Sequence, residues 1–237
     1  MAGKLYKGKT CVYCCVEGVS DTGDHVFPRE LFLKDRRDNL PQVPACNKCN
    51  GDKSKLEHYL TAVLPFGGRH DDALSNLENM VPPRLKNNQK LHRRLAAGAT
   101  KELLSRPSGL LIPTTTIPFD AEKLEKLFVF VVKGLMWHHW KVLLGSDCGV
   151  QVTIPGEVQR PFYEKLFQHR AKARLDEDLG KGTVKYVSAQ GIDKPIISIW
   201  RFSLYGGLHL ADAPAFPGEI LSAIYAVTGP AIVVGEC

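Results

Sequence analysis

Apolar residues at helical spacing recur after Asn47 and predict a helix in this part of the chain. They lie three and four positions apart, the interval that gathers side chains on one face of a helix, at Leu56, Tyr59, Leu60 and Val63. Residues 65–68 read Pro-Phe-Gly-Gly, a composition typical of a helix end. Upstream, residues 25–27 and 39–44 are predicted to be short extended runs, because proline biases the residue before it away from the helical region. The expected order is therefore strand, loop, strand, helix.

The rest of the chain mixes helical and strand-like patterns. Residues 70–106 predict two further helices separated by Pro82-Pro83, and residues 107–118 predict a linker because they hold three prolines, a glycine and a threonine run. Beyond the linker, helices are expected at residues 120–144, 161–179 and 219–227, and strands at 150–154, 184–188, 196–204 and 208–210. The predicted fold class is α+β. It comprises one domain in residues 1–106, a linker at 107–118, and an α+β domain in residues 119–237 that would serve specificity, dimerisation or sensing.

Charge separates the two halves of the chain. The formal net charge is +6, and all of it lies in residues 1–106, because residues 107–237 hold equal numbers of acidic and basic side chains. A basic half favours a polyanionic partner, most often nucleic acid, although a basic surface that only aids solubility explains the charge equally well. The N-terminus shows no secretory signal pattern, and the longest apolar run, residues 127–137, is too short to span a bilayer. We therefore expect a cytoplasmic protein with no membrane partner.

Four cysteines form two matching pairs. Cys11 and Cys14 make one Cys-x-x-Cys pair, and Cys46 and Cys49 make the other. Four thiolates give zinc a closed tetrahedral site with no position left for a substrate, and such a site stabilises a segment too small to hold itself together. Cys15, which adjoins the first pair, could compete as a ligand. The pattern predicts structural Zn²⁺.

An Asp-His dipeptide lies between the two cysteine pairs. The carboxylate of Asp24 suits a hard cation such as Mg²⁺, and the neutral imidazole of His25 suits proton abstraction from water near pH 7. The amide oxygen of Asn50 could complete a Mg²⁺ site with Asp24, because the zinc site next to it would hold it in place. Lys53 and Lys55 are close enough in sequence to reach phosphate oxygens.

A basic helix is expected at residues 84–106. Leucines form its apolar side, and lysine and arginine dominate the remainder. Such a helix can lie along a phosphate backbone, and it can equally be a solvated surface helix. The residues expected to bind nucleic acid here are Arg84, Lys86, Lys90, Arg93 and Arg94.

The runs D-H-V-F-P at residues 24–28 and N-L-P-Q-V-P-A-C-N-K-C-N-G-D-K-S at residues 39–54 resemble the HNH endonuclease family in its four-cysteine zinc form. The resemblance covers about residues 8–65 and implies the ββα-metal fold, in which two strands and a helix hold one catalytic divalent cation. It implies His25 as the general base, Asp24 and Asn50 as ligands of the catalytic cation, and Asn39 as the residue that braces the loop and orients the histidine. Asparagine at the final position, where many members have histidine, favours Mg²⁺ or Mn²⁺ over tightly bound transition metals.

These features predict a metal-dependent DNA endonuclease, with restriction, phage defence and mobile elements as candidate settings. Two alternatives remain open: a zinc-bound DNA-binding module without catalysis, and a structural RNA-binding protein. A single ββα site cuts one strand at a time, so cleavage of both strands would favour a homodimer.

Overall fold

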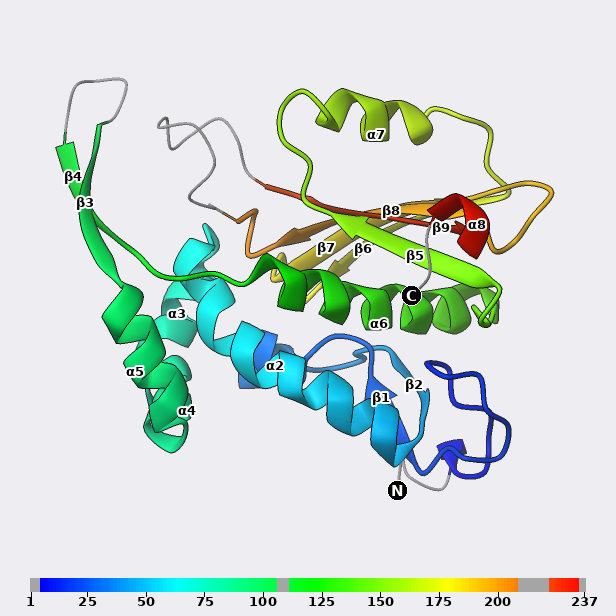
Figure 1. The fold of residues 1–237 in the computed structure, drawn as a ribbon, viewed down its shortest axis with the longest axis horizontal. Helices are drawn as coiled ribbons and strands as arrows, with labels where there is room; N and C mark the ends of the chain where they lie inside the picture. Colours follow the sequence, from blue (N-terminus) through cyan, green and yellow to red (C-terminus); the bar gives the residue numbers. More distant parts are fainter. Residues whose placement is uncertain (1–4, 106–110, 209–221, 235–237) are drawn as a thin grey trace.

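The computed structural model describes residues 5–105, 111–208 and 222–234 and has a mixed α/β architecture (Figure 1). The helices are α2 (Asn47–Gly67), α3 (Asp71–Asn79), α4 (Val81–Asn87), α5 (Gln89–Gly98), α6 (Ala121–Trp140), α7 (Arg160–Leu166) and α8 (Ala231–Val234). The strands are β1 (Thr22–His25), β2 (Gln42–Ala45), β3 (Thr100–Ser105), β4 (Leu111–Thr116), β5 (Cys148–Thr153), β6 (Ala173–Leu179), β7 (Val184–Gln190), β8 (Ser198–Leu204) and β9 (Ile224–Pro230). Two short 3₁₀ segments, η1 (Arg29–Leu31) and η2 (Lys34–Arg36), lie between β1 and β2.

The predicted order of strand, loop, strand and helix is present near the N-terminus. β1 and β2 pair as antiparallel strands with His25 opposite Gln42, and α2 follows β2 directly. The side chain of Cys46 caps α2 by accepting a hydrogen bond from the Cys49 N–H, so a predicted metal ligand also begins the helix. The first strand ends at His25 rather than beginning there.

Five strands form a second, antiparallel sheet in the order β5-β9-β8-β7-β6. α6 lies along one face of this sheet, and α7 lies over the other (Figure 1). The rings of Phe128 in α6 and Phe202 in β8 have their centroids 4.9 Å apart, so the alternate residues of β8 that face α6 form the main aromatic core. The side chain of Asp120 caps α6 by accepting a hydrogen bond from the Lys123 N–H, which confirms the predicted start of this helix.

α6 also packs against the β1–β2–α2 unit, so it lies between that unit and the five-stranded sheet (Figure 1). Val26 approaches α6 so closely that a Cβ on Gly134 would lie 2.9 Å from one of its methyl carbons. The ring of Phe27 lies 5.8 Å from that of Tyr186 in β7, measured between centroids. Val26 and Phe27, which follow His25, are therefore anchored in the main core. This anchoring sets where β1 ends.

The predicted basic helix at residues 84–106 is wrong in its extent. The chain forms α4 and α5, ends the helical segment at Gly98, and continues as β3, which pairs with β4 inside the predicted linker. The ladder between β3 and β4 hydrogen-bonds backbone groups that a linker would expose to water, and only the partner strand makes that possible. Arg106 and residues 107–110 lie outside the described residues. The hydrophobic core continues from one predicted domain into the other.

Two helices predicted in the second half are wrong over part of their length. The helix expected at residues 161–179 ends at Leu166, and Ala173–Leu179 forms the edge strand β6. Within the helix expected at residues 219–227, the described part contains the start of β9, which lies between β5 and β8. A strand buried on both faces presents a continuous apolar run, and periodicity alone cannot distinguish such a run from a buried helix. Residues 209–210 and 219–221 lie outside the described residues.

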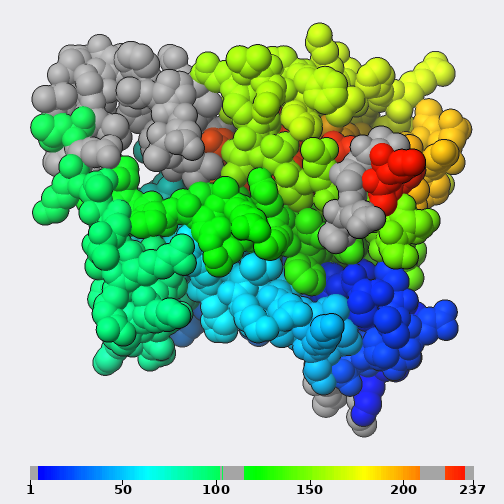
Figure 2. All heavy atoms as spheres, in the orientation of Figure 1, coloured from blue at the N-terminus to red at the C-terminus, as the bar shows by residue number. Residues whose placement is uncertain are grey.

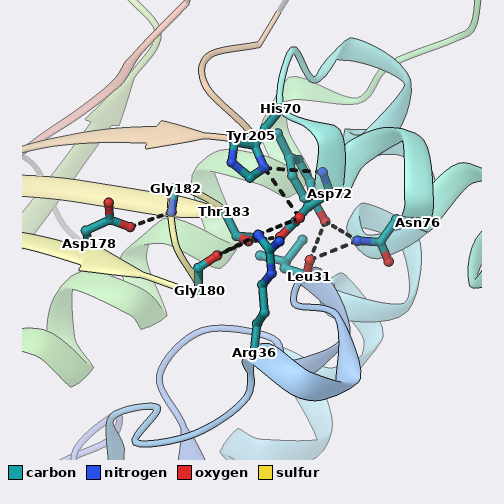
Figure 3. A network of polar contacts seen from close by, with 10 residues as sticks. All are labelled: Leu31, Arg36, His70, Asp72, Asn76, Asp178, Gly180, Gly182, Thr183 and Tyr205. Atoms are coloured by element: carbon teal, nitrogen blue, oxygen red, sulfur yellow. Dashed lines mark hydrogen bonds and ion pairs between the residues drawn. The ribbon is translucent and has the colours of Figure 1, made fainter.

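A buried polar network joins the N-terminal half to the large sheet (Figure 3). Asp72 in α3 is 1% exposed and accepts a 2.5 Å hydrogen bond from the Thr183 hydroxyl, in the turn between β6 and β7. Its other carboxylate oxygen lies 2.7 Å from a guanidinium nitrogen of Arg36 in η2. Tyr205, just after β8, donates a 2.7 Å hydrogen bond to the carbonyl of Leu31. The loop that follows β1 is thereby held against the sheet.

We expect Asp72→Ala to lower the free energy of unfolding by about 2–4 kcal/mol, because it removes the charged acceptor of Arg36 and Thr183 and leaves both to share the Gly180 carbonyl. In a chain of this length each kcal/mol lowers Tm by about 2–4 °C, so thermal unfolding followed by circular dichroism measures the effect. The matched control is Asp71→Ala, the same substitution at the exposed neighbouring position, which we expect to cost less than about 1 kcal/mol. Equal Tm values for the two variants would contradict the structural role of Asp72.

Candidate functional site

The four paired cysteines gather at one end of the β1–β2–α2 unit. The sulfur atoms of Cys11, Cys14, Cys46 and Cys49 all lie within 4.8 Å of one another. Four ligands placed about 2.3 Å from a tetrahedral zinc ion would be about 3.8 Å apart. The Cys46 N–H donates to the Cys11 sulfur at 3.4 Å, so the backbone already supports the thiolate positions. The four-cysteine cluster is positioned to bind one metal ion and is compatible with structural zinc.

The pKa values of the thiols and the position of Cys15 further characterise this cluster. Burial raises the pKa of the Cys11 and Cys49 thiols, so a metal ion must displace protons from them and its affinity falls as the pH falls. Cys15 does not belong to the cluster, since its sulfur donates a hydrogen bond to the Leu144 carbonyl at 3.2 Å.

Asp24 is buried between α2 and the segment from Cys11 to Cys14, which we call the metal-binding loop. It is 8% exposed, and its Oδ2 atom accepts hydrogen bonds from the Tyr13 hydroxyl at 2.5 Å and from the Lys53 ammonium at 2.8 Å. Tyr13 lies between Cys11 and Cys14, so the metal-binding loop carries its hydroxyl to the carboxylate. Burial and the charge of Asp24 raise the pKa of Tyr13 well above its usual value, which keeps the phenol protonated as a donor.

His25 is partly buried at the end of β1. Its Nε2 atom lies 2.9 Å from the side-chain nitrogen of Gln42, its cross-strand partner. Burial lowers the pKa of His25, and the positive charge of Arg29 lowers it further. The imidazole is therefore neutral near pH 7 and able to accept a proton.

A pocket of about 280 Å³ opens beside Asp24 and His25. The rest of its lining comes from the start of η1 and one face of α2: Pro28, Arg29, Glu30, Ser54, Glu57, His58 and Thr61. The four α2 residues lie on one helical face because they are spaced three and four apart. The structure thus brings the Asp-His pair, two further carboxylates and a second imidazole to one cavity.

The structure places the two predicted asparagines differently from each other. Asn50 lies in the first turns of α2 and its amide donates to the Thr22 hydroxyl at 3.4 Å. Thr22 and Asp24 share one face of β1, so Asn50 lies on the Asp24 side of the strand. Asn39 is exposed, with a φ of 57°, in the loop before β2. The side chain that contacts the His25 imidazole is Gln42 rather than Asn39.

The predicted nucleic-acid contacts fall into two groups. Lys55 and four cations on α4 and α5 are exposed, the latter being Lys86, Lys90, Arg93 and Arg94. Lys53, in contrast, is 0% exposed, and Arg84 donates to the Thr61 carbonyl at 2.8 Å and to the Glu30 carboxylate at 2.7 Å. The phosphate contact expected of Lys53 is therefore corrected to buried contacts within the protein, and the guanidinium of Arg84 is paired with Glu30 at the surface.

Three residues of the site do not emerge from sequence reasoning: Tyr13, Gln42 and Glu57. Glu57 could have been found from its spacing, because it lies four residues after Lys53 and three after Ser54 on one helix. Tyr13 and Gln42 carry no such signal, since their contacts depend on the path of the metal-binding loop and on the register between β1 and β2.

Comparison with known proteins assigns no relatives to this chain. A scan against family models returned no match, and searches of curated proteins and of solved structures returned none either. None of the helices in the described residues has both the length and the apolar character needed to cross a bilayer. The chain has a mixed α/β fold with a five-stranded sheet and a four-cysteine cluster positioned to bind a metal ion.

Proposed function

We propose that this chain is a metal-dependent endonuclease of the HNH type that hydrolyses DNA phosphodiester bonds. The observation that carries the proposal is the shared pocket of Asp24 and His25 beside the four-cysteine cluster. A closed four-thiolate site has no open position for a substrate, so the cluster serves as a scaffold and the chemistry belongs to the pocket.

His25 is the general base in this proposal. Its lowered pKa keeps the imidazole neutral, and its Nε2 lone pair, which accepts from the Gln42 amide in this structure, would take a proton from a water molecule as that water attacks phosphorus. Gln42 and the anchored residues Val26 and Phe27 hold the ring in position. The products would carry 5′-phosphate and 3′-hydroxyl ends.

Asp24 and Asn50 are the residues that would hold a divalent cation. Both offer oxygen atoms, the donors that Mg²⁺ and Mn²⁺ prefer. Asp24 on β1 contacts Lys53 of α2, and Asn50 on α2 contacts Thr22 of β1. When bound, such a cation would stabilise the charge that develops on the phosphate and on the leaving oxygen.

The exposed cations of α4 and α5 supply a DNA-binding surface that starts near the pocket. Arg84 in α4 contacts Glu30 and Thr61, which both line the pocket. In the space-filling view the metal-binding loop, α2 and α5 form one continuous strip of surface (Figure 2). Because these contacts would be made mainly to phosphates, binding should weaken steeply as salt increases.

A cleavage assay tests the proposal. Zinc-loaded protein is incubated with supercoiled plasmid in the presence of Mg²⁺, of Mn²⁺, or of no added divalent cation, and nicked and linear products are quantified. We expect cleavage only with added cation, and we expect Asp24→Asn, which keeps the shape of the side chain, to abolish it. Nicked product would indicate one site acting alone, whereas linear product from a single encounter would indicate a homodimer. A plasmid that stays intact with every cation would overturn the endonuclease proposal.

One observation favours a second function, DNA binding without cleavage. Asp24 already holds an ammonium group and a phenol on one oxygen, whereas a nuclease needs that carboxylate for its cation. A gel-shift measurement alongside the cleavage assay separates the two functions, because a non-catalytic module would retain plasmid binding while leaving the DNA intact.

A further inference from the structure

Lys53 is fully buried within the proposed catalytic site. Its side chain is 0% exposed, and its ammonium nitrogen lies 2.8 Å from Asp24 Oδ2, 2.8 Å from Glu57 Oε1 and 2.5 Å from the His25 carbonyl oxygen. An ammonium group has three donors, and these three oxygens satisfy all of them.

The carboxylates around Lys53 carry more negative charge than one ammonium group neutralises. A lysine is rarely buried unless it is paired, yet here two carboxylates, Asp24 and Glu57, face a single positive charge. Asp24 Oδ2 also accepts from Tyr13, so the lone pairs of that oxygen are already used. The ammonium is therefore surrounded by oxygen atoms, and oxygen atoms are also the ligands that a hard metal cation prefers.

Glu57 differs from Asp24 in its exposure and in its position. Its side chain is 24% exposed and lines the pocket, whereas the side chain of Asp24 is 9% exposed. Glu57 lies four residues after Lys53 on α2, so this pair belongs to one helix and persists if β1 shifts relative to that helix. The contact between Lys53 and Asp24 joins α2 to β1, so it would be lost if β1 shifted relative to α2.

We propose that Lys53 is an internal counter-ion that competes with the divalent cation for Asp24, and that Glu57 holds the ammonium when Asp24 binds the cation. This inference rests on the proposed role of Asp24 as a cation ligand. Lys53 and Glu57 are positioning residues in this scheme, and they set how tightly the site binds its cation. The competition weakens binding of the cation, because part of its interaction with Asp24 replaces an existing ion pair.

Mn²⁺ binding to zinc-loaded protein tests the inference without relying on activity. Isothermal calorimetry and electron paramagnetic resonance measure the Mn²⁺ dissociation constant of the native chain and its variants. We expect Lys53→Met, which removes the charge but keeps the length of the side chain, to tighten binding by at least about tenfold. We expect Glu57→Gln to weaken binding by a similar factor, because the ammonium then has only Asp24 as a charged partner.

The double variant Lys53→Met/Glu57→Gln separates competition from a structural role. Without the ammonium, Glu57 has nothing to hold, so we expect Glu57→Gln to have little further effect in the Lys53→Met background. An equal effect of Glu57→Gln in both backgrounds would overturn the inference, as would weaker or unchanged Mn²⁺ binding by folded Lys53→Met. If Lys53→Met fails to fold, Glu57→Gln alone decides, and unchanged Mn²⁺ binding by that variant overturns the inference.

Asp24→Asn assigns the Mn²⁺ signal to the proposed site. We expect it to abolish the Mn²⁺ binding that the other variants modulate, and binding that survives this change overturns the inference. The outcome is distinguishable from that of the endonuclease proposal. Competition at Asp24 without plasmid cleavage would refute only the endonuclease, and cleavage without competition would refute only the role of Lys53 and Glu57.

Discussion

Replacing His25 by alanine is expected to lower the rate of DNA cleavage by about 10²–10⁴-fold, the usual contribution of a positioned general base. The imidazole lies at the pocket that also holds Asp24, and its pKa is lowered by burial and by Arg29. The next two residues, Val26 and Phe27, cannot take its place because they are apolar and fully buried. Plasmid binding should be retained, since the exposed cations of α4 and α5 are untouched.

The pH profile gives a second measure of the same role. Cleavage requires the neutral imidazole, so the rate should rise with pH and level off once His25 has lost its proton. Because the pKa of His25 lies below its usual value of about 6.5, the midpoint of the acidic limb should lie below that pH. The rate should therefore stay constant from neutral pH downward until the imidazole begins to take up a proton.

A matched control separates the loss of the base from a general loss of structure. His169→Ala makes the same substitution at an exposed position after α7 and should cleave at the native rate. Added imidazole should partly restore the activity of His25→Ala, because the small molecule can occupy the space left by the side chain. Native-like cleavage by His25→Ala would refute the assignment of His25 as the base.

Removal of the metal from the four-cysteine cluster is expected to unfold the N-terminal unit. Structural zinc sites of this kind contribute about 10–16 kcal/mol of apparent binding free energy at pH 7, which is comparable to or larger than the typical stability of about 5–15 kcal/mol of a whole domain. Tyr13 lies within the metal-binding loop and Cys46 caps α2, so losing the metal should release Asp24 and fray the start of α2. Hydrogen exchange measured with and without a zinc chelator should show faster exchange across residues 11–64.

Serine substitutions provide the control for that experiment. Cys49→Ser removes a ligand from the cluster and should lower the measured zinc content and the protection of α2. Cys15→Ser changes a cysteine next to the cluster whose sulfur contacts Leu144, and it should keep one zinc ion per chain. Zinc loss from Cys15→Ser but not from Cys49→Ser would show that the ligand set is wrong.

Local patterns predicted the elements whose signals lie within a few residues of each other. α2 was predicted from the spacing of its apolar residues, and the helix predicted to begin at residue 120 is α6, which Asp120 caps. β6 and β9 were missed because a strand is stabilised by neighbours that are distant in sequence. β9 also lies between two other strands, so its residues show no alternation that would have identified it.

The features of the candidate site also divide into those that the sequence predicts and those that depend on the tertiary structure. The spacing of the four cysteines and the position of the Asp-His pair between them could be recognised from sequence alone, because a metal site needs donors of a given type at short separations. The environment of each side chain could not be recognised from sequence alone. Asn39 was expected beside His25, but the register of β1 and β2 places Gln42 there. The charges of Lys53 and Arg84 were expected to face a phosphate, but the fold buries Lys53 and pairs Arg84 with Glu30.

The sequence by itself determined which chemical groups this protein carries and that four cysteines lie where one metal ion could hold them. It also determined that the excess positive charge lies in the first 106 residues. Only the tertiary structure decided that Asp24, His25, Glu57 and His58 share a pocket and that a buried ammonium occupies the carboxylate of Asp24. The physical reason is that residue type sets which interactions a group can make, whereas burial and long-range packing set which of them it does make.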